Sequence, residues 1–251
     1  HDKPLAKASE KEVLACVAPE TLGYKFKVIN GLGTITGWSG DATHLVIPAS
    51  FEMSDGNKEW CEPVRVIGAG AFQNRNFKKV TIPQSVEEIQ DEAFQGGELI
   101  EIEIPHSVIN IGNNAFAGNP ATNSGTSGGD TSKPKVVVKG SSNGRSISGS
   151  AFGGSNFIYS PVTSEDVGII IRTKVGSNGI KTASIAGRTS SSGSSSLGEN
   201  PSSSQDYHNT VITIPKEIEV NGELLPVTEV DSGAFQGSGL IDVIMPEGLL
   251  Y

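Results

Sequence analysis

The sequence contains few of the residues from which catalytic and metal sites are built. Among its 251 residues there are only 2 Cys and 4 His, and no C-x-x-C pair that could form a zinc ribbon or a redox motif. No His lies at ligand spacing from a Cys or a second His, so we expect surface loop residues rather than ligands at His1, His44, His106 and His208. No G-x-S-x-G motif occurs, and no carboxylate pair lies in contrasting surroundings. The sequence therefore predicts a protein that is not an enzyme and has no cofactor and no metal.

Positive charge and long apolar runs are also scarce. The net charge is −9, and the isoelectric point is near 5.0. An acidic surface repels nucleic-acid phosphates, disfavours anionic lipid and favours solubility. No apolar run reaches the ~18 residues of a membrane-spanning helix. We therefore expect no nucleic-acid partner and no membrane insertion.

The two cysteines, Cys16 and Cys61, leave two alternatives open. They form one disulfide if the protein is exported, or they remain as two free, half-buried thiols. The chain begins at His1 rather than at Met. We expect either a trimmed chain or a mature form whose signal peptide has been removed. The sequence does not decide whether the native chain continues past Tyr251, or what its oligomeric state is.

Two short motifs imitate ligand sites. "GLGTITG" (31–37) resembles part of a glycine-rich nucleotide loop, yet no helix pattern follows it, and Thr and Ile alternate as in a strand. "DGNKE" (55–59) has acidic residues at alternate positions, but it lacks the length and the closing Glu of a calcium loop. We expect a strand at the first motif and a polar turn at the second.

The sequence does contain a repeat of 22 residues. The dipeptide Ala-Phe recurs at 71–72, 93–94 and 115–116, and Ile-Pro recurs at 82–83 and 104–105. An Ile also stands five positions before the Phe of all three Ala-Phe pairs. Several independent markers at one period indicate a repeat architecture.

Each repeat has two halves. The first is a short strand such as "FKKVTIP" (77–83), in which alternate apolar residues face one side and Pro ends the ladder. The second, such as "QSVEEIQDEAFQG" (84–96), returns the chain along the opposite side with its Phe pointing inward. One such unit is too small to bury its own apolar face, so copies must stack.

Stacking has two specific consequences. Residues at equivalent positions of successive repeats lie above one another, so we expect Phe72, Phe94 and Phe116 to form one column. Each buried Phe contributes roughly 1.5–3 kcal/mol. On the outward side of the strands, Lys79 should neighbour Glu101 as a cross-strand ion pair.

The pattern L-x-x-V-x-I-P-x-S-V-x-x-I-x-x-x-A-F-x-G resembles the BspA-like leucine-rich repeats. These occur on surface and secreted proteins of host-associated bacteria and in some protists. Residues 64–118 fit closely, 135–153 loosely, and 211–246 fit again. The resemblance implies a mainly β fold, a short right-handed leucine-rich-repeat solenoid with parallel strands and tight convex turns. It implies a scaffold rather than a particular activity.

We expect three segments along the chain. Residues 1–23 form an N-terminal helical or capping segment. Residues 24–160 form a first module, in which a β-hairpin start with Asn30-Gly31 at its turn precedes the repeats. Residues 161–251 form a second module that also starts with a hairpin, within 167–186, and holds a truncated set of repeats.

Three shorter features belong to these segments. "SEKEVLACVA" (9–18) carries a capping box and predicts a short N-terminal helix. Mixtures of Gly, Ser, Asn and Pro predict a flexible insertion at 119–134 and a flexible loop at 188–205.

The resemblance also indicates a function. Solenoids present extended concave surfaces, so the outward side chains of the strands are the candidate ligand-binding residues: His44, Lys79, Thr81, Glu101, Glu103 and Lys135. We expect a cell-surface or secreted bacterial binding or adhesion protein whose partner is a host extracellular protein or glycan. The alternative is a structural spacer or stalk that presents another domain and has no ligand of its own.

Overall fold

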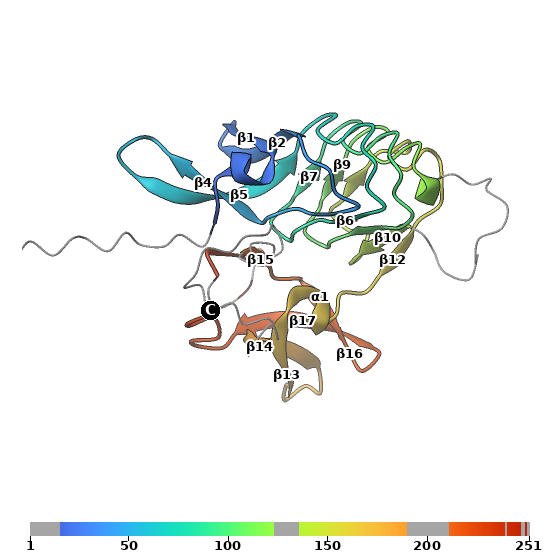
Figure 1. The fold of residues 1–251 in the computed structure, drawn as a ribbon. Helices are drawn as coiled ribbons and strands as arrows, with labels where there is room; N and C mark the ends of the chain where they lie inside the picture. Colours follow the sequence, from blue (N-terminus) through green and yellow to red (C-terminus); the bar gives the residue numbers. More distant parts are fainter. Residues whose placement is uncertain (1–15, 123–135, 190–210, 239, 247–248, 250–251) are drawn as a thin grey trace, which may run out of the picture.

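The protein is known here from a computed structural model, which describes residues 16–122, 136–189, 211–238, 240–246 and 249. These residues form mainly short β-strands, joined by tight turns and a few single helical turns (Figure 1). None of the helices in the described ranges is long and apolar enough to cross a membrane.

The coils of the N-terminal part each contribute one strand to a row of parallel strands: β3 (His44–Val46), β6 (Lys79–Thr81), β8 (Ile102–Ile104), β10 (Val136–Lys139) and β12 (Ile158–Ser160). Leu45 is paired with Val80, and Ile104 with Val138, so apolar residues meet across the row. We call the outward side of this row the strand face. Alternation places the inward residues in the core and leaves the polar residues between them on this face.

A second row of parallel strands lies on the return side of the coils: β5 (Glu59–Ile67), β7 (Glu88–Ile89), β9 (Asn110–Ile111) and β11 (Ser146–Ile147). Ile67, Ile89, Ile111 and Ile147 pair in succession along it. The sequence predicted only tight turns on this side, and that prediction was incomplete. Stacking the isoleucines at strand spacing also brings their main chains within hydrogen-bonding distance.

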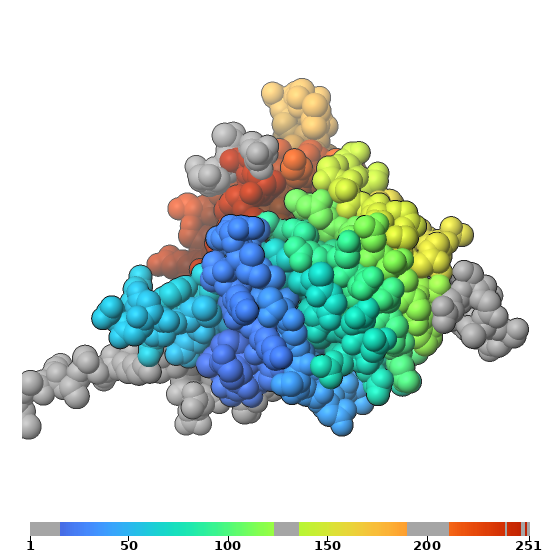
Figure 2. Space-filling model, turned by 90° about the horizontal axis from the view of Figure 1, so that it is seen from above, coloured from blue at the N-terminus to red at the C-terminus, as the bar shows by residue number. Residues whose placement is uncertain are grey.

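The Phe residues of the Ala-Phe turns form one column through the coils. The rings of Phe72 and Phe94 are 5.0 Å apart with planes 8° from parallel, and those of Phe94 and Phe116 have the same distance and angle. Phe152 continues the column at 5.6 Å, and Phe157 closes it. In Figure 2 the coils appear as successive bands of colour from blue to yellow. The predicted column of equivalent Phe residues is therefore confirmed.

Hairpins and a disulfide close the N-terminal end of this stack. β1 (Tyr24–Ile29) and β2 (Leu32–Trp38) form the predicted hairpin, with positive φ angles of 52° at Asn30 and 80° at Gly31. β4 (Ser50–Ser54) forms a second, unpredicted hairpin with β5. Its turn is the polar turn expected at "DGNKE", and the Asp55 carboxylate accepts main-chain N–H bonds there.

The disulfide joins Cys16 to Cys61 and decides between the two alternatives that the sequence left open. Cys16 precedes the 3-10 turn η1 (Pro19–Leu22), and Cys61 lies in β5. The predicted helix at 9–18 does not include residues 16–18, which are not helical, and its residues 9–15 lie outside the described ranges. Pro19 instead starts η1 beside the disulfide.

The proposed flexible insertion begins later than the sequence predicted. Residues 120–122 form the 3-10 turn η2 (Pro120–Thr122), and Asn119 is fully buried. The Asn119 side-chain amide donates to the carbonyl oxygens of Phe94 and Phe116, and its oxygen accepts from the N–H of Leu99. The buried amide thus fixes the start of the segment, while residues 123–134 lie outside the described ranges.

The C-terminal part repeats the order of elements that opens the chain: α1 (Ser164–Val167), β13 (Ile169–Val175), β14 (Lys181–Arg188), β15 (Val211–Thr213), β16 (Glu217–Val220), β17 (Glu223–Val230) and β18 (Asp242–Ile244). β13 and β14 form the predicted hairpin, while β16 and β17 form a second, unpredicted one. β14 is parallel to β17 and β15 to β18, as β2 is to β5 and β3 to β6. This part has its own apolar core around Val167, Ile185 and Ile218.

Candidate functional site

The strand face carries a polar ladder over β3, β6 and β8. The imidazole Nε2 of His44 lies 2.7 Å from the hydroxyl oxygen of Thr81. The Lys79 ammonium lies 3.2 Å from the Glu101 carboxylate, so the ion pair predicted between adjacent coils is present. Both partners of that pair are more than half exposed, so it adds little to stability. The ladder is thus available for contacts with a ligand.

A groove of about 480 Å³ follows this ladder. Four of the six predicted ligand-binding residues line it: Lys79, Thr81, Glu101 and Glu103. His44 lies beside it, bonded to Thr81, and Lys135 lies outside the described residues. The parallel register explains the grouping, because residues two positions apart on a strand share a face and equivalent positions of adjacent strands are neighbours.

The C-terminal part contacts one end of the groove and contributes Asp166 to its lining. The side-chain amide of Gln84 donates to the main-chain oxygen of Asp166 at 2.6 Å. The Thr213 hydroxyl donates to the main-chain oxygen of Gln84 at 2.5 Å. At the groove wall, the Lys139 ammonium lies 3.0 Å from the Asp166 carboxylate, and both side chains are at most one-fifth exposed. These contacts hold α1 and β15 against Gln84, which follows β6, and hold α1 against Lys139, which ends β10.

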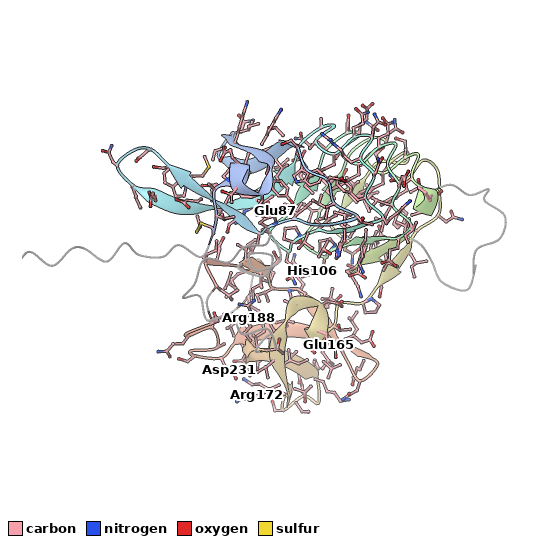
Figure 3. All side chains as sticks on the ribbon, in the orientation of Figure 1. Glu87, His106, Glu165, Arg172, Arg188 and Asp231 are labelled. Carbon is pink, nitrogen blue, oxygen red and sulfur yellow. A yellow bond between two sulfur atoms is a disulfide. The ribbon has the colours of Figure 1, made fainter. Side chains whose placement is uncertain are left out.

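His106 lies at this boundary between the two parts (Figure 3). Its ring Nε2 is 2.8 Å from the main-chain oxygen of Thr213, a contact that requires Nε2 to carry the proton. Burial lowers the pKa of His106 to about 4, with the nearby Arg145 guanidinium acting in the same direction. The hydrogen bond to Thr213 and the Asp166 carboxylate oppose this shift. The ring is therefore neutral at neutral pH.

The prediction that His106 is a surface loop residue is only partly right, because it lies in the turn after β8 but its ring is only partly exposed. Its position after Pro105, at the end of a strand, is the signal that misled, because such residues are usually exposed. Docking of the C-terminal part covers the ring, and this contact joins residues 107 positions apart in the sequence. No local pattern reports such a contact.

Sequence analysis also missed three other residues of the groove. Gln84 and Lys139 follow or end strands of the first row, and Asp166 lies in α1. The sequence signal that could have found Asp166 is its capping box with Thr163, which predicts a helix start there. Nothing in the sequence places that helix beside Lys139.

The groove lacks the arrangement of a hydrolytic site. The Thr81 hydroxyl and the His44 imidazole are within hydrogen-bonding distance, as a nucleophile and a base would be. Both lie on an open strand face, and no hydrogen bond among the described residues orients the second ring nitrogen of His44. Among the described residues, no group of three or more His, Cys, Asp or Glu could hold a metal ion.

A second depression, of about 470 Å³, lies over β7 and β9. Two of its polar side chains are already bonded: the Gln90 amide donates to the Glu88 carboxylate, and the Asp91 carboxylate accepts from the main-chain N–H of Asn113.

Solved structures of bacterial leucine-rich-repeat proteins resemble the chain. A leucine-rich repeat protein from Bacteroides capillosus is 23% identical over 51% of this chain and 96% of its own, with a TM-score of 0.26. A leucine rich cell surface protein from Faecalibacterium prausnitzii is 14% identical over 99% of this chain and 78% of its own, with a TM-score of 0.17. The pneumococcal vaccine antigen PcpA is 15% identical over 90% of this chain and 63% of its own, with a TM-score of 0.29.

The family model gives the more specific result. No curated protein matches the chain. Residues 62–133 match the model described as "BspA type Leucine rich repeat region", in 6 copies. The matched range contains Phe72, Phe94 and Phe116, whose rings form the column, together with β6 to β9. Residues 62–133 are therefore a BspA-type leucine-rich repeat region.

Proposed function

We propose that the protein is a non-enzymatic binding protein of the bacterial cell surface or exterior, and that the groove is its ligand site. The observation that carries this proposal is the clustering of Lys79, Thr81, Glu101 and Glu103 in one groove. Asp166 of the C-terminal part also lines this groove. Concave surfaces of this kind are the usual binding sites of repeat scaffolds. Its partner is then a host extracellular protein or a glycan.

The Cys16–Cys61 disulfide supports a location outside the cytoplasm, because disulfides persist in oxidising compartments. The two separate apolar cores support a division into two modules, 24–160 and 161–251, of which the second supplies Asp166 to the groove. In this arrangement the second module shapes the site and does not act as a spacer alone.

Binding of the purified chain to a panel of extracellular-matrix proteins and glycans tests the proposal. Glu103→Lys reverses an exposed charge inside the groove, and Glu20→Lys makes the same charge change on η1, away from it. We expect Glu103→Lys to weaken binding of the best ligand at least tenfold, which corresponds to about 1.4 kcal/mol. Glu20→Lys should leave binding unchanged.

Two results contradict the proposal. If no ligand on the panel binds at micromolar concentration, the alternative of a structural spacer is favoured. If Glu20→Lys weakens binding as much as Glu103→Lys does, the effect is one of net charge, and the ligand does not occupy the groove.

A further inference from the structure

The charged side chains of the groove are paired with one exception. The Lys79 ammonium lies 3.2 Å from the Glu101 carboxylate, and the Lys139 ammonium lies 3.0 Å from the Asp166 carboxylate. The Glu103 side chain is exposed and has no hydrogen bond or ion pair with any other described residue. The groove therefore presents one negative charge that no described neighbour compensates.

A strip of aliphatic side chains begins beside this carboxylate. Glu103 is paired with Val137 of β10, and Val137 is paired with Ile158 of β12. Paired residues of parallel strands point to the same side, so the three side chains stand in one row on the strand face. Val137 lines the groove and is partly exposed, and Ile158 in the next strand is 47% exposed. The row thus joins an unpaired carboxylate to an apolar surface.

Strand spacing sets the distances along this row. Because adjacent strands are about 4.8 Å apart, Val137 stands about 4.8 Å and Ile158 about 9.6 Å from Glu103. In an extended polypeptide, side chains two residues apart point the same way and are about 6.6–6.8 Å apart. A chain that crosses the strands with one side chain over Glu103 therefore places another between Val137 and Ile158.

We propose that the groove binds an extended segment of a partner protein, with Arg or Lys at one position and an aliphatic residue two positions away. This proposal rests on the proposed function, because it names the ligand of the same groove. The basic side chain donates to the Glu103 carboxylate, and the aliphatic side chain is buried against Val137 and Ile158. Arg is the stronger donor, because its guanidinium can bond both carboxylate oxygens.

A glycan fits these observations less well. Sugar rings bind largely by stacking their C–H face on aromatic side chains, and the described residues that line the groove include no Phe, Tyr or Trp. An anionic glycan would also bring its own charge against the Glu103 carboxylate. A protein segment supplies both the cation and the apolar side chain that the row accepts.

Selection of random peptides on the immobilised chain gives the first test. We expect the enriched peptides to carry Arg or Lys with Val, Ile or Leu two positions away. Selection on Glu103→Lys should lose this pattern, while Glu20→Lys, which makes the same charge change on η1, should keep it. Enriched peptides without a basic residue, the same pattern on Glu103→Lys, or no enriched peptide at all overturns the proposal.

Three synthetic peptides then measure the two contacts separately. The probe is fluorescent Gly-Ser-Arg-Ser-Val-Ser-Gly, and its two copies carry Glu in place of Arg, or Ser in place of Val. We expect the Glu copy to bind at least about tenfold more weakly than the probe, and the Ser copy at least about threefold more weakly. Equal binding of the three peptides, or no binding of the probe at millimolar concentration, contradicts the proposal.

Ile158→Ser tests the aliphatic contact from the side of the protein. We expect this variant to bind the probe at least about threefold more weakly than the wild type, and to lose the difference between the probe and the Ser copy. Ile170→Ser, on β13, removes an Ile of similar exposure (48%) and is the matched control. Equal binding of the probe by the two variants shows that the row does not receive the aliphatic side chain, and the proposal fails.

Failure of this proposal can be told apart from failure of the proposed function. If the best ligand of the panel is a glycan whose binding Glu103→Lys weakens, the groove is the ligand site but its ligand is not a protein segment. If Glu103→Lys and Glu20→Lys weaken binding of the best ligand equally, the ligand does not occupy the groove and both proposals fail.

Discussion

The imidazole of His106 and the main-chain carbonyl of Thr213 are joined by a hydrogen bond of 2.8 Å across the boundary between the two parts of the chain. Around it lie Arg145, whose guanidinium donates to the carbonyl oxygen of His106, and the Lys139–Asp166 ion pair. The state of one partly buried ring therefore depends on whether the two parts remain docked.

This contact predicts a loss of stability in acid. The folded-state pKa of His106, about 4, lies below the value of about 6.5 in an unfolded chain, so the unfolded state takes up the proton first as pH falls. The contribution of His106 is intact above about pH 6.5 and is lost progressively down to about pH 4, by up to roughly 3 kcal/mol. Urea denaturation at a series of pH values measures it.

His106→Gln is the informative variant, because an amide N–H can still donate to the Thr213 oxygen but does not titrate in this range. We expect a shallower decline of stability between pH 6.5 and 4 in this variant than in the wild type. His44→Gln, on the exposed strand face, is the control and should follow the wild type. Parallel curves for wild type and His106→Gln would contradict the lowered pKa of His106 in the folded protein.

Phe94 lies in the middle of the aromatic column, with Phe72 and Phe116 each 5.0 Å from its ring. Phe94→Ala should cost about 3–5 kcal/mol of unfolding free energy, because it removes a buried ring and leaves a cavity between two others. Phe157→Ala, at the partly exposed end of the column, should cost less than half as much. Equilibrium denaturation of both variants tests this, and equal costs would argue against a continuous column.

Asn119 satisfies three buried main-chain groups at once, on Phe94, Leu99 and Phe116. Asn119→Ala should destabilise the protein by roughly 2–4 kcal/mol, because these groups lose their partner without gaining water. Asn57→Ala, in the exposed hairpin turn, serves as the control and should change stability by less than about 0.5 kcal/mol. A small effect at Asn119 would mean that water replaces the amide.

The Cys16–Cys61 disulfide closes a loop with a sequence separation of 45 residues. Replacing both cysteines by Ser should lower the unfolding free energy by about 4 kcal/mol on the loop-entropy relation. Adding a reductant to the wild-type protein should reproduce the loss, while it leaves the double variant unchanged. Thermal unfolding with and without reductant measures both effects, and an unchanged midpoint in the double variant would show that the bond is dispensable.

Local repetition made much of the fold predictable from sequence. The 22-residue spacing of Phe72, Phe94 and Phe116 predicted their column, and the same register predicted the Lys79–Glu101 pair. Asn30-Gly31 predicted a hairpin, because both residues tolerate positive φ. The equivalent dipeptide Asn221-Gly222, also with positive φ at both residues, closes the hairpin of β16 and β17.

The sequence by itself determined the coil, because identical coils stacked in register leave one arrangement for the apolar residues. Tertiary structure alone decided what lies against the coils. The pairing of Cys16 with Cys61, the partial burial of His106 and the place of Asp166 in the groove all depend on contacts between segments distant in sequence. Such contacts follow from the docking of two surfaces, and the residues that make them carry no periodic signal.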